Sequence, residues 1–270
     1  MDKPTIEAVI KNWRLPERGS LTERINAMIR RDLMKGLFGS SATLIVGGVQ
    51  YHLGGVQDTE DLAKLAGITA SDQVLDVACF LGGPALQLAE AYQSRVRGID
   101  KNEFCVRAAN KIASMCGLHH RARFEVADAR ELPFDDGAFS VVWSQCSLAH
   151  DETWLQEMHR VLKHPGRLAL TFAIRRENPD QNSPQWSLHD VVHHIQDLGY
   201  TILHAEDITR RDIDIGWRAL DNQLSEREDE FTVLLGEEWV RRAHLKFATE
   251  IELMQNGQWG NGRIIAEKTS

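Results

Sequence analysis

The chain has 270 residues and a formal net charge of −8, with 43% hydrophobic and 26% charged residues. These proportions are typical of a globular protein, and the acidic balance argues against a nucleic-acid partner, because phosphates attract basic surfaces. The opening residues MDKPTIEAVI lack the layout of a signal peptide, no apolar run reaches membrane-spanning length, and the four cysteines form no C-x-x-C pair. We therefore expect a cytoplasmic protein with reduced thiols and no membrane partner.

Residues 1–57 are predicted to form an N-terminal helical cap. Ser20 and Glu23 fit a capping box, and apolar residues then recur at helical spacing as far as Leu37, before Gly39. The stretch QYHLGG at 50–55 follows. Its tyrosine and histidine either face a bound ligand or belong to an ordinary glycine-rich turn.

Residues 58–209 are predicted to form an α/β core, with Asp58 capping its first helix. The stretch 74–100, VLDVACFLGGPALQLAEAYQSRVRGID, predicts a strand, a glycine turn, a helix and a second strand that ends at Asp100. Glycines allow the backbone to approach a ligand, and the terminal carboxylate can accept hydrogen bonds from ribose hydroxyls. This order predicts a nucleotide-type site at the carboxyl ends of parallel strands.

Further strands are expected near 123–127, 139–143, 168–174 and 201–208, with helices between them. Residues 210–261 read as an acidic helical insertion, and 262–270 hold the last strand. Because strands alternate with helices, the sheet should be parallel. The predicted fold is α/β: a Rossmann-like, mostly parallel seven-stranded sheet with helices on both faces and a helical lid.

Several segments together resemble the class I S-adenosylmethionine (SAM) dependent methyltransferases. The stretch 74–100 is similar to their D-x-G-x-G-x-G motif, although Ala78 and Phe80 stand at the first two glycine positions. ADARELPF at 127–134 resembles the segment that lines the adenine pocket, and FSVVW at 139–143 and RVLKHPG at 160–166 resemble later family segments. The resemblance covers about residues 50–175 and implies SAM as cofactor, with S-adenosylhomocysteine as product.

The resemblance also implies a set of cofactor-binding residues. Asp100 would hold the ribose, Asp128 would accept the adenine amine, and Gly82 with its neighbours would hold the methionine portion. For both aspartates the alternative is a helix cap. The full expected set is Asp76, Ala78, Gly82, Gly83, Asp100, Lys101, Asp128, Ala129, Ser144 and Gln145.

Two residues are candidates for catalysis. SQCSLAH at 144–150 is similar to a loop of sarcosine/dimethylglycine-type N-methyltransferases, and also to the S-L-x-H loop of natural-product O-methyltransferases. His150 is therefore the expected general base, since the unperturbed pKa of histidine is near 6.5; the alternative is a histidine that caps the next helix or bonds a backbone group. Tyr51 is the second candidate. His189 and His193 have metal-ligand spacing but no third ligand, so no metal is expected.

We expect methyl transfer from SAM to a small molecule, by preference an amine, because the acidic insertion would attract a cation. The alternatives are O- or C-methylation of a natural product or quinone precursor, as in UbiE-like enzymes, and a SAM-binding domain without catalysis, suggested by Phe80. Residues 210–261 and the helix near 20–37 would form the substrate lid. As a protein partner we consider a second copy of this chain, in a homo-oligomer.

Overall fold

The computed structural model describes residues 6–33, 41–148 and 150–269. Its centre is one seven-stranded sheet in the order β3-β2-β1-β4-β5-β7-β6. Only β7 runs antiparallel to its neighbours, so the predicted mostly parallel sheet is confirmed. The strands are β1 (Gln73–Val77), β2 (Arg95–Asp100), β3 (Ala122–Val126), β4 (Phe139–Gln145), β5 (Leu162–Arg175), β6 (Tyr200–Asp207) and β7 (Trp259–Lys268).

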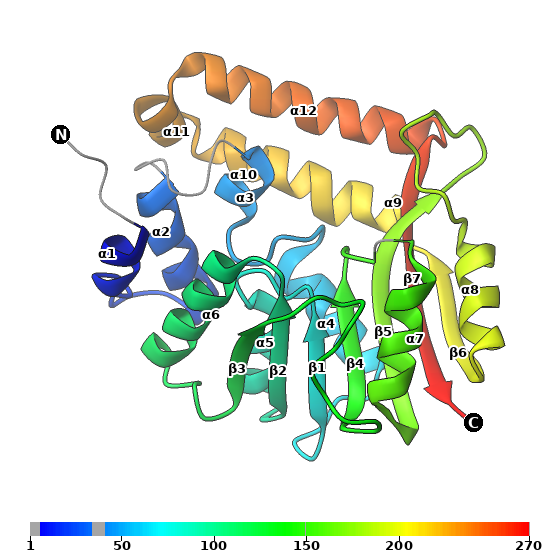
Figure 1. The fold of residues 1–270 in the computed structure, drawn as a ribbon. Coiled ribbons are helices and arrows are strands. Elements are labelled where there is room, and N and C mark those ends of the chain that lie inside the picture. Colours follow the sequence, from blue (N-terminus) through cyan, green and yellow to red (C-terminus); the bar gives the residue numbers. More distant parts are fainter. Residues whose placement is uncertain (1–5, 34–40, 149, 270) are drawn as a thin grey trace.

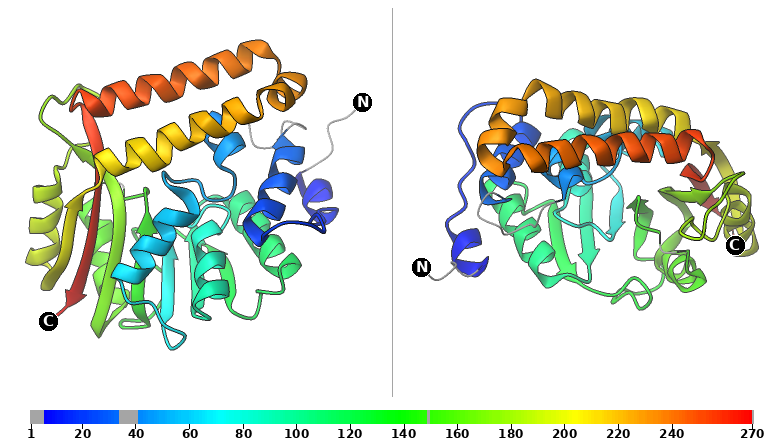
Figure 2. Two further views of the ribbon diagram at one scale, coloured as in Figure 1. Left: turned by 180° about the vertical axis from the view of Figure 1, so that it is seen from behind. Right: turned by 90° about the horizontal axis from the view of Figure 1, so that it is seen from above.

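Helices cover both faces of the sheet (Figures 1 and 2). One face carries α4 (Gly55–Leu65), α5 (Gly83–Ala91) and α6 (Glu103–Met115), and the other carries α7 (Glu152–Val161) and α8 (Leu188–Asp197). Side chains alternate along a strand, so Val74 joins the first hydrophobic cluster and Leu75 the second. The sheet is therefore buried on both sides, as parallel sheets require.

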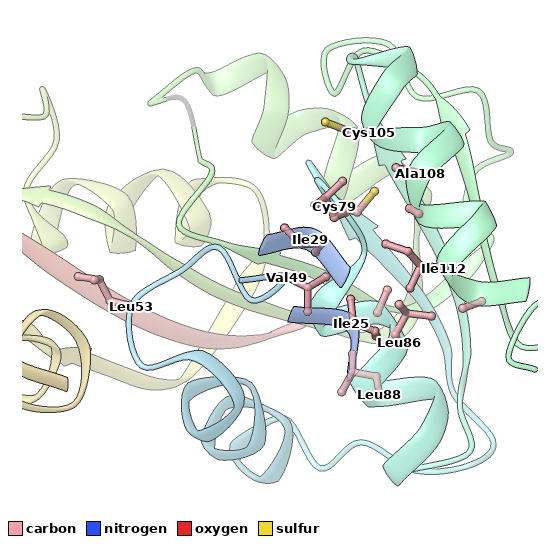
Figure 3. Close-up of a cluster of buried hydrophobic side chains, with 14 of the residues drawn as sticks. Ile25, Ile29, Val49, Leu53, Cys79, Leu86, Leu88, Cys105, Ala108 and Ile112 are labelled. Atoms are coloured by element: carbon pink, nitrogen blue, oxygen red, sulfur yellow. The ribbon is translucent and has the colours of Figure 1, made fainter. Parts of the chain in front are cut away.

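The N-terminal cap holds α1 (Ile6–Lys11), α2 (Leu21–Leu33) and α3 (Ala42–Gly47). The predicted capping box is present: Ser20 N donates to Glu23 Oε2 at 2.7 Å, and Glu23 N donates to Ser20 Oγ at 3.3 Å. Figure 3 shows Ile25 and Ile29 of α2 in the same buried cluster as Leu86 of α5. The expected helix end at Gly39 lies outside the described residues.

The insertion after β6 is helical, as predicted, and crosses above the carboxyl ends of the parallel strands (Figure 1). It consists of α9 (Thr209–Asp212), a π-helical segment η1 (Ile213–Arg218), α10 (Ala219–Glu226), α11 (Glu228–Leu235) and α12 (Glu237–Gln255). Its α10 packs against α3 of the cap. Across the described residues, every helix is too short or too polar to cross a membrane.

Three boundaries differ from the sequence prediction. Helix α4 begins at Gly55, after Gly54 in a left-handed conformation, so Asp58 is not its cap but a buried residue of its first turn. Strand β5 begins at Leu162 rather than at 168, and β7 begins at Trp259 rather than at 262. The cause is tertiary: Leu162 pairs with Phe139 of β4, and β5 and β7 pair with each other from Gly166↔Lys268 to Arg175↔Trp259.

Candidate functional site

Two adjoining cavities open at the carboxyl ends of the central strands. The first, of about 430 Å³, lies beyond β2 and β3, and the second, of about 230 Å³, lies beyond β1 and β4. Ala78, Asp100 and Ser147 line both. The first also includes Lys101, Asp128, Ala129, Arg130, Asp151 and Trp154, and the second Tyr51, His52, Asp76, Phe80, Gln145 and Cys146.

The turn from β1 to α5 contributes Ala78, Cys79 and Phe80 to the cavity walls. Ala78 and Phe80 take left-handed φ values of 61° and 49°, although neither is glycine. Such values cost about 1–2 kcal/mol per residue. The backbone N of Phe80 donates to Asp100 Oδ2 at 3.0 Å, and its ring packs on that of Tyr51 with centroids 5.0 Å apart. These contacts hold the bulky side chain in a turn that usually favours glycine.

The two retained glycines are needed for close packing within the protein. A Cβ on Gly82, whose φ is 77°, would lie 2.5 Å from Cζ of Phe124, and a Cβ on Gly83 would lie 2.5 Å from the carbonyl oxygen of Val49. Gly83 begins α5, with Pro84 in its first turn. The sequence predicted both glycines as cofactor contacts, but the spaces that a side chain would occupy are filled by protein atoms.

Asp76 is the most unusual carboxylate of the second cavity. It is 2% exposed, and its Oδ2 has no hydrogen-bond partner among the described residues. Burial, and then the charge of Asp100, raise the pKa of its carboxyl to about 8. A buried unpaired acceptor is costly, so this side chain is suited to a cationic or hydrogen-donating ligand group.

Asp100 ends β2 on the wall that the two cavities share. Its Oδ1 accepts from Asn102 N at 2.8 Å, and Asn102 caps α6, so the alternative of a helix cap does not apply to Asp100. Asp128 lies at the rim of the first cavity and forms two hydrogen bonds with the guanidinium of Arg130, at 3.0 and 2.6 Å. These bonds lower the pKa of Asp128 to about 2. The expected adenine contact would have to share this carboxylate with Arg130.

Ser144 lies outside both cavity linings. It is fully buried, and its hydroxyl donates to the carbonyl of Val77 at 3.0 Å, which ties the end of β4 to β1. Gln145 lines the second cavity, but its amide is occupied: Nε2 donates to Asp58 at 2.8 Å, and Oε1 accepts from Trp143 and Thr59 at 3.1 Å each. Both residues therefore support the floor of the site in this structure.

A buried polar network lies behind Gln145. Asp58 accepts from Arg211 of α9 at 2.8 Å and from Arg263 of β7 at 2.6 Å, and its Oδ2 lies 3.6 Å from His52 Nδ1. Burial lowers the pKa of His52, against the opposing charge of Asp58. The network joins the cap, the core and the insertion. The sequence analysis missed it, since its members are far apart in the chain.

Tyr51 and Cys146 are exposed side chains that line the second cavity. Tyr51 is 45% exposed, and its hydroxyl lies 3.5 Å from Ser41 Oγ. Cys146 has a left-handed φ of 53°, and its Sγ lies 3.7 Å from Thr171 Oγ1. The surrounding protein, followed by the charges of Asp212 and Asp58, raises the pKa of the thiol to about 12, so the thiol is neutral.

His150 lies near the site but outside both linings. Its ring packs edge-to-face on Trp186 at 5.4 Å, and neither ring nitrogen has a hydrogen-bond partner among the described side chains. Asp151, not His150, caps α7. Burial lowers the pKa of His150, against a backbone hydrogen bond with Ala173 that raises it, and a lowered pKa favours the neutral imidazole. Ser147 and Trp154, which the sequence analysis did not single out, line the first cavity instead.

Residues 74–166 match a family model described as a methyltransferase domain. The chain is 41% identical over 115 residues to 27-O-demethylrifamycin SV methyltransferase of Amycolatopsis mediterranei, covering 42% of each chain. It is 28% identical over 247 residues to glycine/sarcosine/dimethylglycine N-methyltransferase of Actinopolyspora halophila, covering 82% of this chain and 42% of the relative. The chain thus spans less than half the length of these curated relatives.

The fold is shared with solved structures of low sequence identity. Phosphoethanolamine N-methyltransferase 2 of Haemonchus contortus, solved in complex with S-adenosyl-L-methionine, superposes with a TM-score of 0.79. The identity is 16%, over 94% of this chain and 61% of that chain. This likeness concerns the arrangement of strands and helices.

Proposed function

We propose that this chain, which carries a class I SAM-dependent methyltransferase domain, transfers a methyl group from SAM to a small molecule. The observation that carries the proposal is Asp76, a buried carboxylate with an unpaired oxygen, in a cavity that shares Asp100 with its neighbour. Ligands of open α/β sheets bind at this edge. A ligand with an ammonium group and a ribose would satisfy both carboxylates.

The described residues fit SAM in a definite orientation. Asp76 would pair with the ammonium of the methionine portion, and Asp100 would accept from the ribose hydroxyls. The larger first cavity, beside Lys101 and Ala129, would hold the adenine. Tyr51 and Cys146 of the second cavity would then be available to contact an acceptor.

The cofactor, when bound, supplies a methyl group on a positively charged sulfur whose leaving group is a neutral thioether. The work of the chain is therefore to position the acceptor, exclude water and keep the acceptor atom unprotonated. We propose that Tyr51 contacts the acceptor. His150 would serve as base if its ring turns from Trp186 toward the second cavity.

The insertion at 210–261 and the helix near 20–37 of the cap at 1–57 are proposed to form the substrate lid over the core at 58–209, with 262–270 completing the sheet. The position of α10 against α3, above the strand ends, supports this assignment (Figure 1). If it is correct, amide exchange in 217–256 slows when a SAM analogue and an acceptor are both bound. Protection confined to 74–150 would contradict it. The expected cytoplasmic location and oligomer stay predictions.

Calorimetry tests the cofactor assignment. Asp100→Ala should remove a charge-assisted hydrogen bond worth about 1.5–3 kcal/mol, so SAM affinity should fall by about 10- to 150-fold. Glu103→Ala, which removes an exposed carboxylate of α6 outside both linings, should leave the affinity unchanged. Equal affinities for the two variants would show that the ribose lies elsewhere. Release of S-adenosylhomocysteine then separates an enzyme from a domain that only binds SAM.

A further inference from the structure

A third cavity, of about 260 Å³, lies between the N-terminal cap and the insertion. Its lining includes Thr22 and Asn26 of α2, Gln57 of α4, and Ala219 and Gln223 of α10. His52 lines this cavity and also the second one, so the two lie on either side of one imidazole. The third cavity thus adjoins the second across the His52 ring, next to the region in which an acceptor would meet the methyl group.

The walls of the third cavity are polar but uncharged, as far as the described residues show. Asn26 Oδ1 accepts from Val49 N at 2.8 Å, which leaves its NH₂ to donate into the cavity. Gln57 Nε2 donates to Asp61 at 2.7 Å, which leaves its carbonyl oxygen to accept. The amide of Gln223 makes no hydrogen bond with the described residues. The cavity therefore offers neutral donors and acceptors beside the apolar side chains of Ile215 and Leu220.

The carboxylates of α4 that neighbour the lining of the third cavity, Asp58 and Asp61, are paired with arginines. Asp58 binds Arg211 and Arg263, and Asp61 binds Arg211 at 2.5 Å. On the exposed side of the insertion, Glu238 pairs with Arg241 and Arg242 at 2.8 and 2.7 Å. Asp212, a buried acid of the insertion, pairs with Arg211 at 3.2 Å and accepts from Asn261 at 2.7 Å. Neither carboxylate is left unpaired to attract a cationic acceptor.

We propose that the acceptor is an uncharged molecule with hydroxyl, carbonyl or amide groups, and that its non-reacting part occupies the third cavity. Its reacting atom would lie in the second cavity, beyond His52 and beside Tyr51. A carboxylate or phosphate in the third cavity would lose its hydration without gaining a described counter-charge, which is costly. A methylated glycine would also leave this volume unfilled. The inference rests on the proposed function and specifies its substrate class.

The test combines an acceptor screen with a variant that fills the third cavity. Transfer from labelled SAM is measured to a library of uncharged hydroxylated natural products, and to dimethylglycine and phosphoethanolamine as charged probes. We expect transfer to uncharged members only. Ala219→Phe should raise the KM of such an acceptor at least about tenfold without changing SAM affinity. Ser225→Phe, on the exposed side of the same helix, is the matched control and should change neither.

Gln223→Leu is a second variant in case Ala219→Phe fails to fold, because it changes a partly solvated position. It removes one amide of the third cavity and should also raise the KM of the acceptor. Three outcomes would overturn the inference. The protein could transfer methyl groups to the charged probes, or neither variant could alter the acceptor KM. A protein that binds SAM could also fail to methylate any uncharged member of the library. Failure of the wild-type protein to bind SAM would instead refute the proposed function.

Discussion

The buried carboxyl of Asp76 should make the free energy of unfolding depend on pH. Its pKa is raised from 3.8 to about 8 in the folded protein. Between these values the folded state holds a proton that the unfolded state has released, so this group lowers stability as pH rises and has no further effect above about pH 8. At about 1.4 kcal/mol per pH unit, the loss between pH 6 and pH 8 is on the order of 3 kcal/mol.

Asp76→Asn keeps the shape of the side chain and removes its titration. The variant should therefore lose about 3 kcal/mol less stability than the wild type over this interval, as measured by urea unfolding at both pH values without ligand. Asp100→Asn is the control, because it removes the neighbouring charge and should lower the pKa of Asp76 without abolishing the slope. Parallel pH profiles for wild type and Asp76→Asn would refute the argument.

The carboxyl of Asp76 must ionise to pair with an ammonium group, so SAM binding at pH 7 should release a proton. Calorimetry in buffers of different ionisation enthalpy detects this release, and Asp76→Asn should abolish it. His150→Ala should lower kcat by about 10²–10⁴ with little change in SAM affinity if His150 is the base, whereas a near-normal kcat would leave it as a packing partner of Trp186. Gly82→Ala should destabilise the protein by more than about 1 kcal/mol, because it adds left-handed strain to a clash with Phe124; an unchanged unfolding midpoint would show that Phe124 can move aside.

The sequence alone was sufficient for the sheet and for the sheet edge at which the first two cavities open. The apolar runs at 74–77 and 96–99 are local signals, and burial of a parallel strand on both faces requires them. Asp100 could be identified because an acid at the end of a strand lies at the carboxyl edge in any such sheet. Ser20 and Glu23 formed their capping box because capping depends on residues three apart in the chain.

What the sequence could not determine depends on residues that meet only through folding. The interpretation of Gly82 and Gly83 as ligand contacts stays a prediction, but the ring of Phe124 and the backbone of Val49, both distant in sequence, are a second reason for their lack of side chains. Asp58 was read as a helix cap, but it is buried and accepts hydrogen bonds from Arg211 and Arg263.

The substrate side was decided by tertiary structure for the same reason. Its third cavity is lined by residues of α2, of the stretch 47–57 and of the helices η1 and α10. The sequence pattern of each segment does not show that these residues meet to form an uncharged wall. The insertion is acidic in composition, but folding places charges such as that of Glu238 toward solvent. Composition gives the number of charges in a segment. A bound ligand interacts strongly only with the few charged groups close to it, because water and salt screen the others.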